Sequence, residues 1–167
     1  MEYSANYIVR AEIWLFITTL VYFLMNGAQI FETAVIVPKW TASPPESFQL
    51  LGGKYGLNLK TFWIVVHSIH ELTFVLALIF CWKIIPVRNW VLLLFVLHMA
   101  VRAWTLLYFA PNIIAFQSIA NGSVPEADLL AKANLWRTLN YVRVSLFILI
   151  SCCFIPLCMW IINIKVR

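Results

Sequence analysis

The stretch VVHSIHE at residues 65–71 decides how this chain folds, because it lies inside an apolar run, residues 61–82, that is long enough to cross a bilayer. Imidazoles and carboxylates are costly to place in hydrocarbon, so ionisable residues in such a run indicate a functional site facing the interior of a helical bundle. His67 and Glu71 are four residues apart and share one helix face, and His70 lies on the flank of that face. The stretch therefore predicts a polar site embedded in a membrane.

The composition points to the same environment. Of the 167 residues, 63% are hydrophobic and only 11% are charged, whereas about a quarter of the residues of a soluble domain are charged. We expect an integral, multi-pass membrane protein of one domain, residues 1–167. The formal charge of +5 is spread over loops and ends without a Lys/Arg run, so no nucleic-acid-binding surface is predicted. The N-terminal segment lacks a basic region and a clear cleavage site, so we expect its helix to be retained.

Four segments reach the roughly 20 apolar residues that a spanning helix needs, and their continuous apolarity excludes the alternating pattern of a membrane barrel. We expect these helices near residues 13–37, 61–82, 87–109 and 139–162. The first should end at Pro38 and the third at Pro111, because proline has no backbone N–H to donate. The predicted fold is all-α, an integral membrane four-helix bundle.

The connections between these helices differ in length. Residues 83–86 make a short loop, so the second and third helices should be antiparallel neighbours. In the third connection we expect a short helix at the membrane surface over residues 111–120, a turn at residues 121–122, and a capping box at residues 123–126 that starts the last helix near residue 124. Lys and Arg are densest at the two termini and the short loop, which predicts that both termini are cytoplasmic.

Polar residues on all four helices fall at a similar depth when they are placed at about 1.5 Å per residue. They lie in the half of the membrane away from the short loop and are Asn26, Gln29 and Glu32; His67, His70 and Glu71; His98 and Arg102; and Arg137, Asn140 and Arg143. Random placement would scatter them over both halves, so we expect them to line one shared cavity. We expect Glu71 or Glu32 to pair with Arg102 or Arg143, because an unpaired charge at this depth costs at least a few kcal/mol.

Several of these polar and aromatic residues could also have a purely structural role. Asn26 and Gln29 could join helices through hydrogen bonds, and Arg137 could extend its charge to the interface. Aromatic residues at the same end could be interface anchors or the walls of a pocket; they are Trp63, Trp104, Tyr108, Trp136 and Tyr141. The candidate site residues are Glu32, His67, His70, Glu71, His98, Arg102, Asn140 and Arg143.

Three short motifs resemble a known family. They are GAQIFE at residues 27–32 followed by Pro38, YFAPNI at residues 108–113, and Trp136, Asn140 and Arg143 at the entry of the last helix. In these motifs and in its layout the chain resembles the anthrone oxygenase-like family of small four-helix membrane proteins. The resemblance implies an oxidoreductase of the monooxygenase type acting on a flat, polycyclic substrate, because fungal members are linked to the oxidation of anthrones to anthraquinones. The cluster of His67, His70 and Glu71 is not part of that family's pattern.

The first function that the residues allow is an oxidoreductase acting on a lipophilic substrate. His67 and His98 with the carboxylate of Glu71 would suit non-haem iron, and Glu32 is an alternative third ligand. A haem between His70 and His98 is also open by residue count. The cofactor stays undecided between non-haem iron and none, because the same residues serve a route without any cofactor.

In the route without a cofactor, His67 is a base that removes a substrate proton, and Arg102 or Arg143 stabilises the resulting oxyanion.

The second function that the residues allow is a non-redox lipid isomerase, because the spacing of His67 and Glu71 is similar to that in the sterol isomerase family. A third is a non-enzymatic subunit that binds or transports a ligand. Four helices without a visible internal repeat argue against a self-contained transporter but leave a homo-oligomer open. The expected partners are membrane lipids and a lipophilic small molecule.

Overall fold

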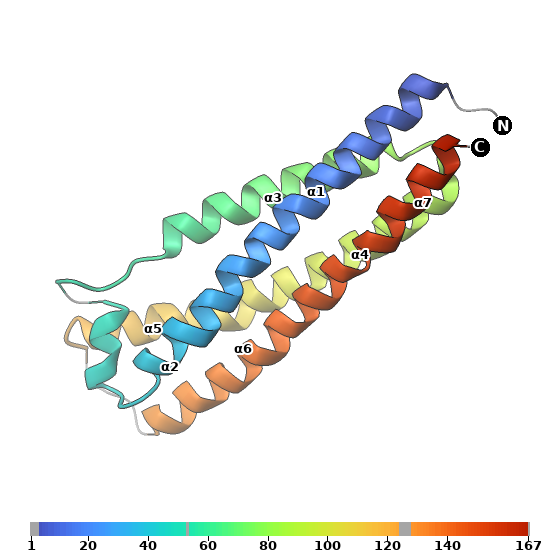
Figure 1. Cartoon of the computed structure of the whole chain (residues 1–167). Coiled ribbons are helices and arrows are strands. Elements are labelled where there is room, and N and C mark those ends of the chain that lie inside the picture. The colour runs from blue at the N-terminus through green and yellow to red at the C-terminus, as the bar shows by residue number, and fades with distance from the viewer. Residues whose placement is uncertain (1–3, 53, 124–127, 167) are drawn as a thin grey trace. The chain divides into compact units, whose positions relative to one another are not determined.

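The computed structural model describes residues 4–52, 54–123 and 128–166, and these residues form helices and turns without a strand (Figure 1). Four helical segments in these ranges are long and apolar enough to cross a membrane: Ala5–Trp40, Lys60–Phe80, Ile85–Ala120 and Leu129–Lys165. The all-α prediction with four helices of spanning length is therefore confirmed. Three of the four helices are longer than the predicted segments.

The first segment consists of α1 (Ala5–Phe31), the π-helix η1 (Glu32–Ile36) and α2 (Val37–Trp40). The prediction that this helix ends at Pro38 is wrong, because the proline lies in the first turn of α2. A proline at that position removes no intrahelical hydrogen bond. The turn before it is widened, since the first residue of α2 donates its N–H to the carbonyl of the first residue of η1, five residues back.

The third segment also contains a proline that follows a π-helical turn. It consists of α4 (Ile85–Trp104), the π-helix η3 (Thr105–Phe109) and α5 (Ala110–Ala120). Pro111 lies in the first turn of α5, and the first residue of α5 donates its N–H to the carbonyl of the first residue of η3. The expected end of the helix at Pro111 is therefore also wrong. A helix over residues 111–120 is confirmed as α5, and its expected place at the membrane surface stays a prediction.

The remaining helices are α3 (Lys60–Phe80), α6 (Leu129–Cys152) and α7 (Phe154–Val166). α6 and α7 are separated at Cys153, and Pro156 explains the break, because its ring clashes with the carbonyl four residues earlier and it has no N–H to donate. A turn follows α5 at the predicted place, with Gly122 at a φ of 103°, which favours glycine. Of the capping box expected at residues 123–126, all but the first residue lie outside the described residues, as does the predicted helix start near residue 124.

The chain divides into two compact units. Unit 1 comprises Met1–Asn26, Trp63–Met99 and Phe147–Arg167, and unit 2 comprises Gly27–Phe62 and Ala100–Leu146. The expectation of a single domain concerns both units together and stays a prediction.

In unit 1 the start of α1, the turn between α3 and α4 and the end of α7 lie at one end. The backbone N–H of Lys83 donates to the hydroxyl of Tyr7 at 2.9 Å, and Lys165 Nζ lies 2.7 Å from Glu12 Oε2. The first and last helices therefore have their chain ends at the same end of this unit, together with the short turn. This is the arrangement that an even number of crossings requires.

Unit 2 has an aromatic core. Its buried members are Val37, Trp40, Phe48, Leu51, Phe109, Phe116, Ala120, Leu129, Ala133 and Trp136. The rings of Trp40 and Trp136 have centroids 4.9 Å apart, and those of Phe48 and Phe116 are 4.7 Å apart. Trp136 is only 4% exposed, so the interpretation of this residue as an interface anchor is wrong. Its large ring packs inside the core, against the rings of Trp40 and Phe109.

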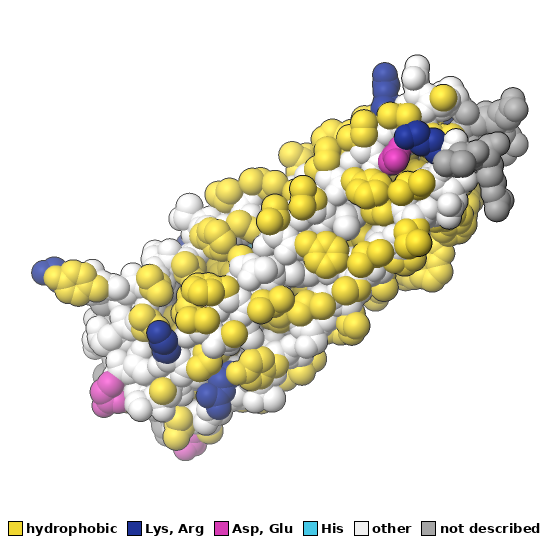
Figure 2. Space-filling model, in the orientation of Figure 1, with side chains coloured by type: hydrophobic (Ala, Val, Ile, Leu, Met, Phe, Trp, Pro, Cys, Tyr) yellow, Lys and Arg dark blue, Asp and Glu magenta, His cyan; other side chains and the backbone are white. Residues whose placement is uncertain are grey.

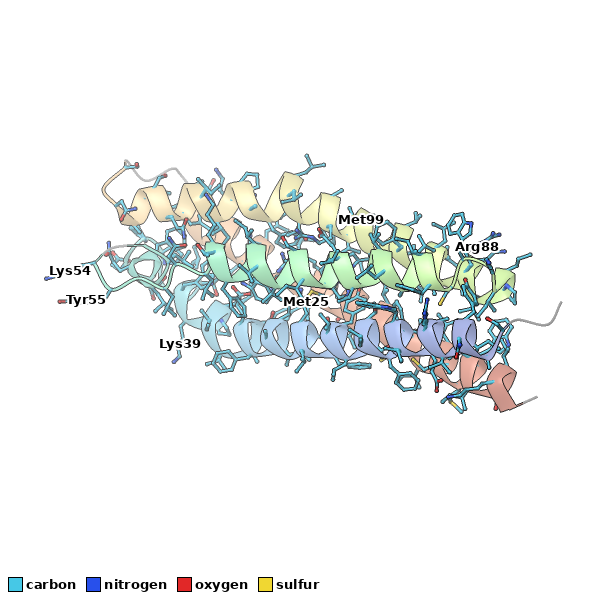
Figure 3. All side chains as sticks on the ribbon, turned by 90° about the horizontal axis from the view of Figure 1, so that it is seen from above. Met25, Lys39, Lys54, Tyr55, Arg88 and Met99 are labelled. Atoms are coloured by element: carbon cyan, nitrogen blue, oxygen red, sulfur yellow. The ribbon has the colours of Figure 1, made fainter. Side chains whose placement is uncertain are left out.

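Unit 2 also carries an irregular loop that contains the 3-10 helix η2 (Glu46–Leu50). An open hollow of about 580 Å³ lies in this loop and is lined by Lys39, Glu46, Ser47, Gln49, Leu50, Lys54 and Tyr55. The side chains of Lys39, Lys54 and Tyr55 project outward from the ribbon (Figure 3). The hollow contains none of the predicted site residues.

Large apolar side chains cover the outside of both units. On the face drawn in Figure 2, hydrophobic side chains dominate and charged ones are few. Leu107 is 80% exposed, Leu24 66% and Leu149 62%. Water-soluble proteins rarely expose contiguous apolar surface of this kind, whereas helices that span a membrane direct such side chains to lipid.

Candidate functional site

A stripe of buried polar side chains runs along one face of the first helical segment. Its members are Thr18, Tyr22, Asn26, Gln29 and Thr33, all less than 9% exposed. Their spacings of four, four, three and four residues place them on one side of a helix. The first three belong to unit 1 and the last two to unit 2, and each part of the stripe contacts one group of predicted site residues.

In unit 1 the stripe meets the three histidines of the chain. The Tyr22 hydroxyl and His98 Nδ1 form a hydrogen bond of 3.0 Å. The ring of His70 lies 4.2 Å from that of Tyr22 and 4.7 Å from that of His98. His70 and His98 are fully buried and His67 is 6% exposed. We call Tyr22, His67, His70 and His98 the histidine cluster, and it lies in the interior of unit 1 rather than on its outer surface.

Aromatic rings surround the histidine cluster. Phe74 and Phe147 lie 5.7 Å and 5.3 Å from the ring of His98, and His67 lies between Trp63 and Phe147, at 5.6 Å and 6.3 Å. The cluster is therefore enclosed by aromatic side chains of unit 1.

Other polar contacts in unit 1 join its helices. Asn26 Nδ2 donates to Ser151 Oγ at 2.8 Å, and Thr18 Oγ1 donates to the Thr73 carbonyl at 2.8 Å. Both bonds link α1 to another helix, as expected of polar side chains that join helices in membranes. Glu71 is half-buried on α3, one turn after the first histidine of that helix.

In unit 2 the stripe meets Asn140 and Arg143 of α6. Asn140 Nδ2 donates to Thr33 Oγ1 at 2.9 Å, and Arg143 Nη2 donates to Asn140 Oδ1 at 2.7 Å. Thr33 and Asn140 are buried. The side-chain amide of Asn140 therefore donates through its nitrogen and accepts through its oxygen. The bond that its oxygen accepts from the guanidinium is charge-assisted. We call Glu32, Thr33, Asn140 and Arg143 the arginine cluster.

The guanidinium of Arg143 packs against two aromatic rings. Its Cζ lies 4.4 Å from the ring centroid of Phe109 and 6.0 Å from that of Trp136. Trp136 Nε1 in turn donates to the carbonyl of Phe109 at 3.3 Å, so the two rings brace each other. Cation–π contacts of this kind stabilise a charge where water is scarce. The Nε atom of Arg143 is buried and has no hydrogen-bond partner among the described residues.

Charges of both signs act on Arg143. Glu32 and Arg102 both interact with it electrostatically, the first favourably and the second unfavourably. The interaction with Glu32 agrees with the expected balance of acidic and basic residues at depth. These three residues together leave one positive charge in excess, which favours a ligand with an electron-rich oxygen.

The structure therefore places the eight predicted residues in two groups. His67, His70, Glu71 and His98 belong to unit 1, and Glu32, Arg102, Asn140 and Arg143 belong to unit 2. The expectation that all eight line one shared cavity stays a prediction. Among the residues that the structure describes, no three His, Cys, Asp or Glu side chains are grouped so that they could hold a metal ion. The proposed iron ligands His67, His98 and Glu71 do not form such a group.

Sequence reasoning missed Tyr22, Thr33 and Ser151. The signal that could have found the first two is the spacing of the buried stripe, because Tyr22 and Thr33 continue the helical period of Asn26 and Gln29 in both directions. Ser151 offers no comparable signal, since a serine within an apolar helix commonly bonds to its own backbone. Comparison of the chain with models of known protein families, with characterised proteins and with solved structures finds no match.

Proposed function

We propose that this chain is a multi-pass integral membrane protein with both termini on the cytoplasmic side. Four helices of spanning length and large exposed apolar side chains support this placement. The even number of such helices in the described ranges, and the common end of α1 and α7 in unit 1, support termini on one side. The density of Lys and Arg near these ends supports the cytoplasmic side.

We further propose that it is an oxygenase-like oxidoreductase that acts on a lipophilic, polycyclic substrate bearing a phenol or a ring ketone. The observation that carries this proposal is Arg143, a guanidinium held by an asparagine and two aromatic rings within a helix of spanning length. Charge at such a depth is costly and is kept where it serves binding or chemistry. A fixed guanidinium is suited to stabilising the oxyanion of an enolised ketone.

The resemblance to the anthrone oxygenase-like family supports the same reaction. The motif residues at 27–32, at 108–113 and on α6 all belong to unit 2, and they include Glu32, Phe109 and Arg143. Residues far apart in the chain thus contribute to one compact unit, around one guanidinium. A shared fold does not by itself define a reaction, so the argument depends on this local arrangement.

The reaction that the resemblance implies balances with dioxygen as the oxidant. A ring methylene beside the aromatic system becomes a carbonyl, one atom of O₂ is the new carbonyl oxygen, and the other leaves as water with the two hydrogens. Removal of the first proton yields an enolate, whose oxygen Arg143 would bind. Glu32, the carboxylate that interacts with Arg143, is the base that we assign to this step.

Purified protein in lipid nanodiscs tests this function with anthrone as the probe. We expect one O₂ consumed per anthraquinone formed, above the background of empty nanodiscs. Arg143→Gln should lower kcat/KM by about a hundredfold, the usual loss for one oxyanion-stabilising donor. Arg137→Gln is the matched control, because this arginine of the same helix donates to Thr41 Oγ1 at 3.4 Å, outside the arginine cluster. No O₂ uptake by the wild type, or full turnover by Arg143→Gln, would refute the proposal.

A second candidate is a non-redox isomerase that moves protons on a membrane lipid. The hydrogen bond between Tyr22 and His98, with His70 packed against both, supports it, because a buried phenol–imidazole pair can donate and accept protons without forming a charge. Glu71→Gln should then abolish isomerisation of a sterol probe while the purified protein keeps its helical circular dichroism. Retained turnover in that variant would remove Glu71 from the mechanism.

A further inference from the structure

Gln29 is buried in unit 2 with an acceptor that no described residue uses. Its side chain is 2% exposed, and its Oε1 has no hydrogen-bond donor among the described residues. Leaving a buried amide oxygen without a donor costs about 1–3 kcal/mol. Such an atom indicates that something else supplies the donor.

The bonds from Thr33 through Asn140 to Arg143 bring the helix turn of Gln29 near the turn of Arg143. Two hydrogen bonds of unit 2 join the first segment to α6: Arg137 with Thr41, and Asn140 with Thr33. Residue numbers rise along the first segment as they fall along α6, so the two run antiparallel. Gln29 lies four residues before Thr33, and Arg143 lies three residues after Asn140. Both residues therefore lie about one helical turn beyond the bond between Thr33 and Asn140.

A second contact supports this placement. Glu32, three residues after Gln29 and therefore on the adjoining part of the same face, interacts electrostatically with Arg143. The neighbourhood thus contains a buried acceptor, Gln29 Oε1, and a buried donor, Arg143 Nε, and neither is used by a described residue. The aromatic ring of Phe109 lies against the guanidinium at 4.4 Å.

We propose that Gln29 and Arg143 form a recognition site for an un-ionised aromatic hydroxyl, that is, a phenol or an enol. The oxygen of such a group accepts from Arg143 Nε, and its hydrogen is donated to Gln29 Oε1. A carboxylate or a phenolate satisfies the arginine but offers no hydrogen to the glutamine, and an ether has none either. This inference rests on the proposed function, since it names the un-ionised form in which the oxygenase site first binds its substrate, before removal of a proton yields the enolate.

The experiment measures equilibrium binding of naphthol and of its methyl ether to the protein in nanodiscs, with empty nanodiscs subtracted. Near neutral pH a phenol keeps its proton, so the two ligands differ mainly in one hydrogen-bond donor. The wild type should bind naphthol about three- to tenfold more tightly, the worth of one hydrogen bond. Gln29→Met should bind both ligands with the affinity of the ether.

A matched control uses Gln117→Met. This glutamine of the same unit donates Nε2 to the Leu51 carbonyl at 3.2 Å and lies in α5, so its replacement should keep the preference for naphthol. Thermal unfolding of each variant separates loss of binding from loss of fold. Equal binding of both ligands by the wild type would overturn the proposal, as would a preference that survives in a folded Gln29→Met, and the buried atoms would then be satisfied by water only. Gln29-dependent binding without any O₂ uptake would leave this inference standing and remove the oxygenase function.

Discussion

The hydrogen-bonded chain from Thr33 through Asn140 to Arg143 predicts a measurable coupling between two residues that are far apart in sequence. Thr33→Val removes one buried hydroxyl that accepts from Asn140 at 2.9 Å, without changing the shape of the side chain. Hydrogen bonds between membrane helices contribute about 0.6 kcal/mol on average and about 1.7 kcal/mol at most. We therefore expect Thr33→Val to lower the free energy of unfolding by about 1 kcal/mol.

Asn140→Leu should cost more, because it removes two bonds and one of them holds a charge. The bond that Arg143 Nη2 donates to Asn140 Oδ1 is 2.7 Å long, and hydrogen bonds to charged groups contribute about 1.5–3 kcal/mol. The variant should therefore lose about 2–4 kcal/mol in all. In the double variant Thr33→Val should add nothing, because its partner is already gone.

The assay is reversible unfolding in mixed micelles, driven by an increasing fraction of SDS and followed by circular dichroism. The coupling energy of the double-mutant cycle should equal the cost of Thr33→Val alone. Thr138→Val is the control, because this exposed threonine donates to the Asn134 carbonyl of its own helix, and its replacement should leave stability unchanged. Additivity of the two substitutions within about 0.3–0.5 kcal/mol would refute the reasoning.

Three further predictions concern contacts elsewhere in the chain. Tyr22→Phe, which loses the 3.0 Å bond to His98, should lower the free energy of unfolding by about 1 kcal/mol, and an unchanged SDS midpoint would contradict this. Burial raises the pKa of the Cys81 thiol, in the turn after α3, to about 12. Alkylation of this thiol near pH 8 should therefore be more than a hundredfold slower than that of an ordinary thiol, and it should accelerate with rising pH. Mass spectrometry of iodoacetamide-treated protein measures the rate, and rapid modification of the folded protein would contradict the prediction. Glu12→Gln, which breaks the partly exposed pair with Lys165, should cost less than about 1 kcal/mol and nothing at high salt, as a comparison of unfolding at two ionic strengths would show.

Much of the fold could be predicted because the apolar runs leave little choice. Twenty apolar residues in succession must form a helix if they are to satisfy their backbone in lipid, and this argument found all four helices. The helix ends at Pro38 and Pro111 could not be predicted in the same way, because a proline that ends one helix is indistinguishable in sequence from a proline that begins the next. The widened turns that allow the second outcome leave no residue signature.

The sequence predicts which types of residue belong to the candidate site better than it predicts which of these side chains contact one another. Ionisable residues at one depth indicated functional positions, but depth alone says nothing about which side chains touch. The partner of His98 is Tyr22 and the partner of Asn140 is Thr33, and both partners are uncharged residues that ordinary helices tolerate anywhere. Their identity depends on how the helices are rotated, which the polar period of α1 alone could have indicated.

The two π-turns have a consequence for how relatives of this chain would have to be aligned. Each such turn accommodates one residue more than an α-helical turn, so it rotates everything that follows by about 100° about the helix axis. Deleting a single residue within Glu32–Ile36 would restore a regular helix and swing Val37 and Trp40 away from the aromatic core that they now help to form. In a homologue with a one-residue gap at this place, the apolar residues after the gap should therefore be shifted by one position. The residues that align with Val37 and Trp40 should differ in homologues that have the gap, even where the rest of the sequence is similar.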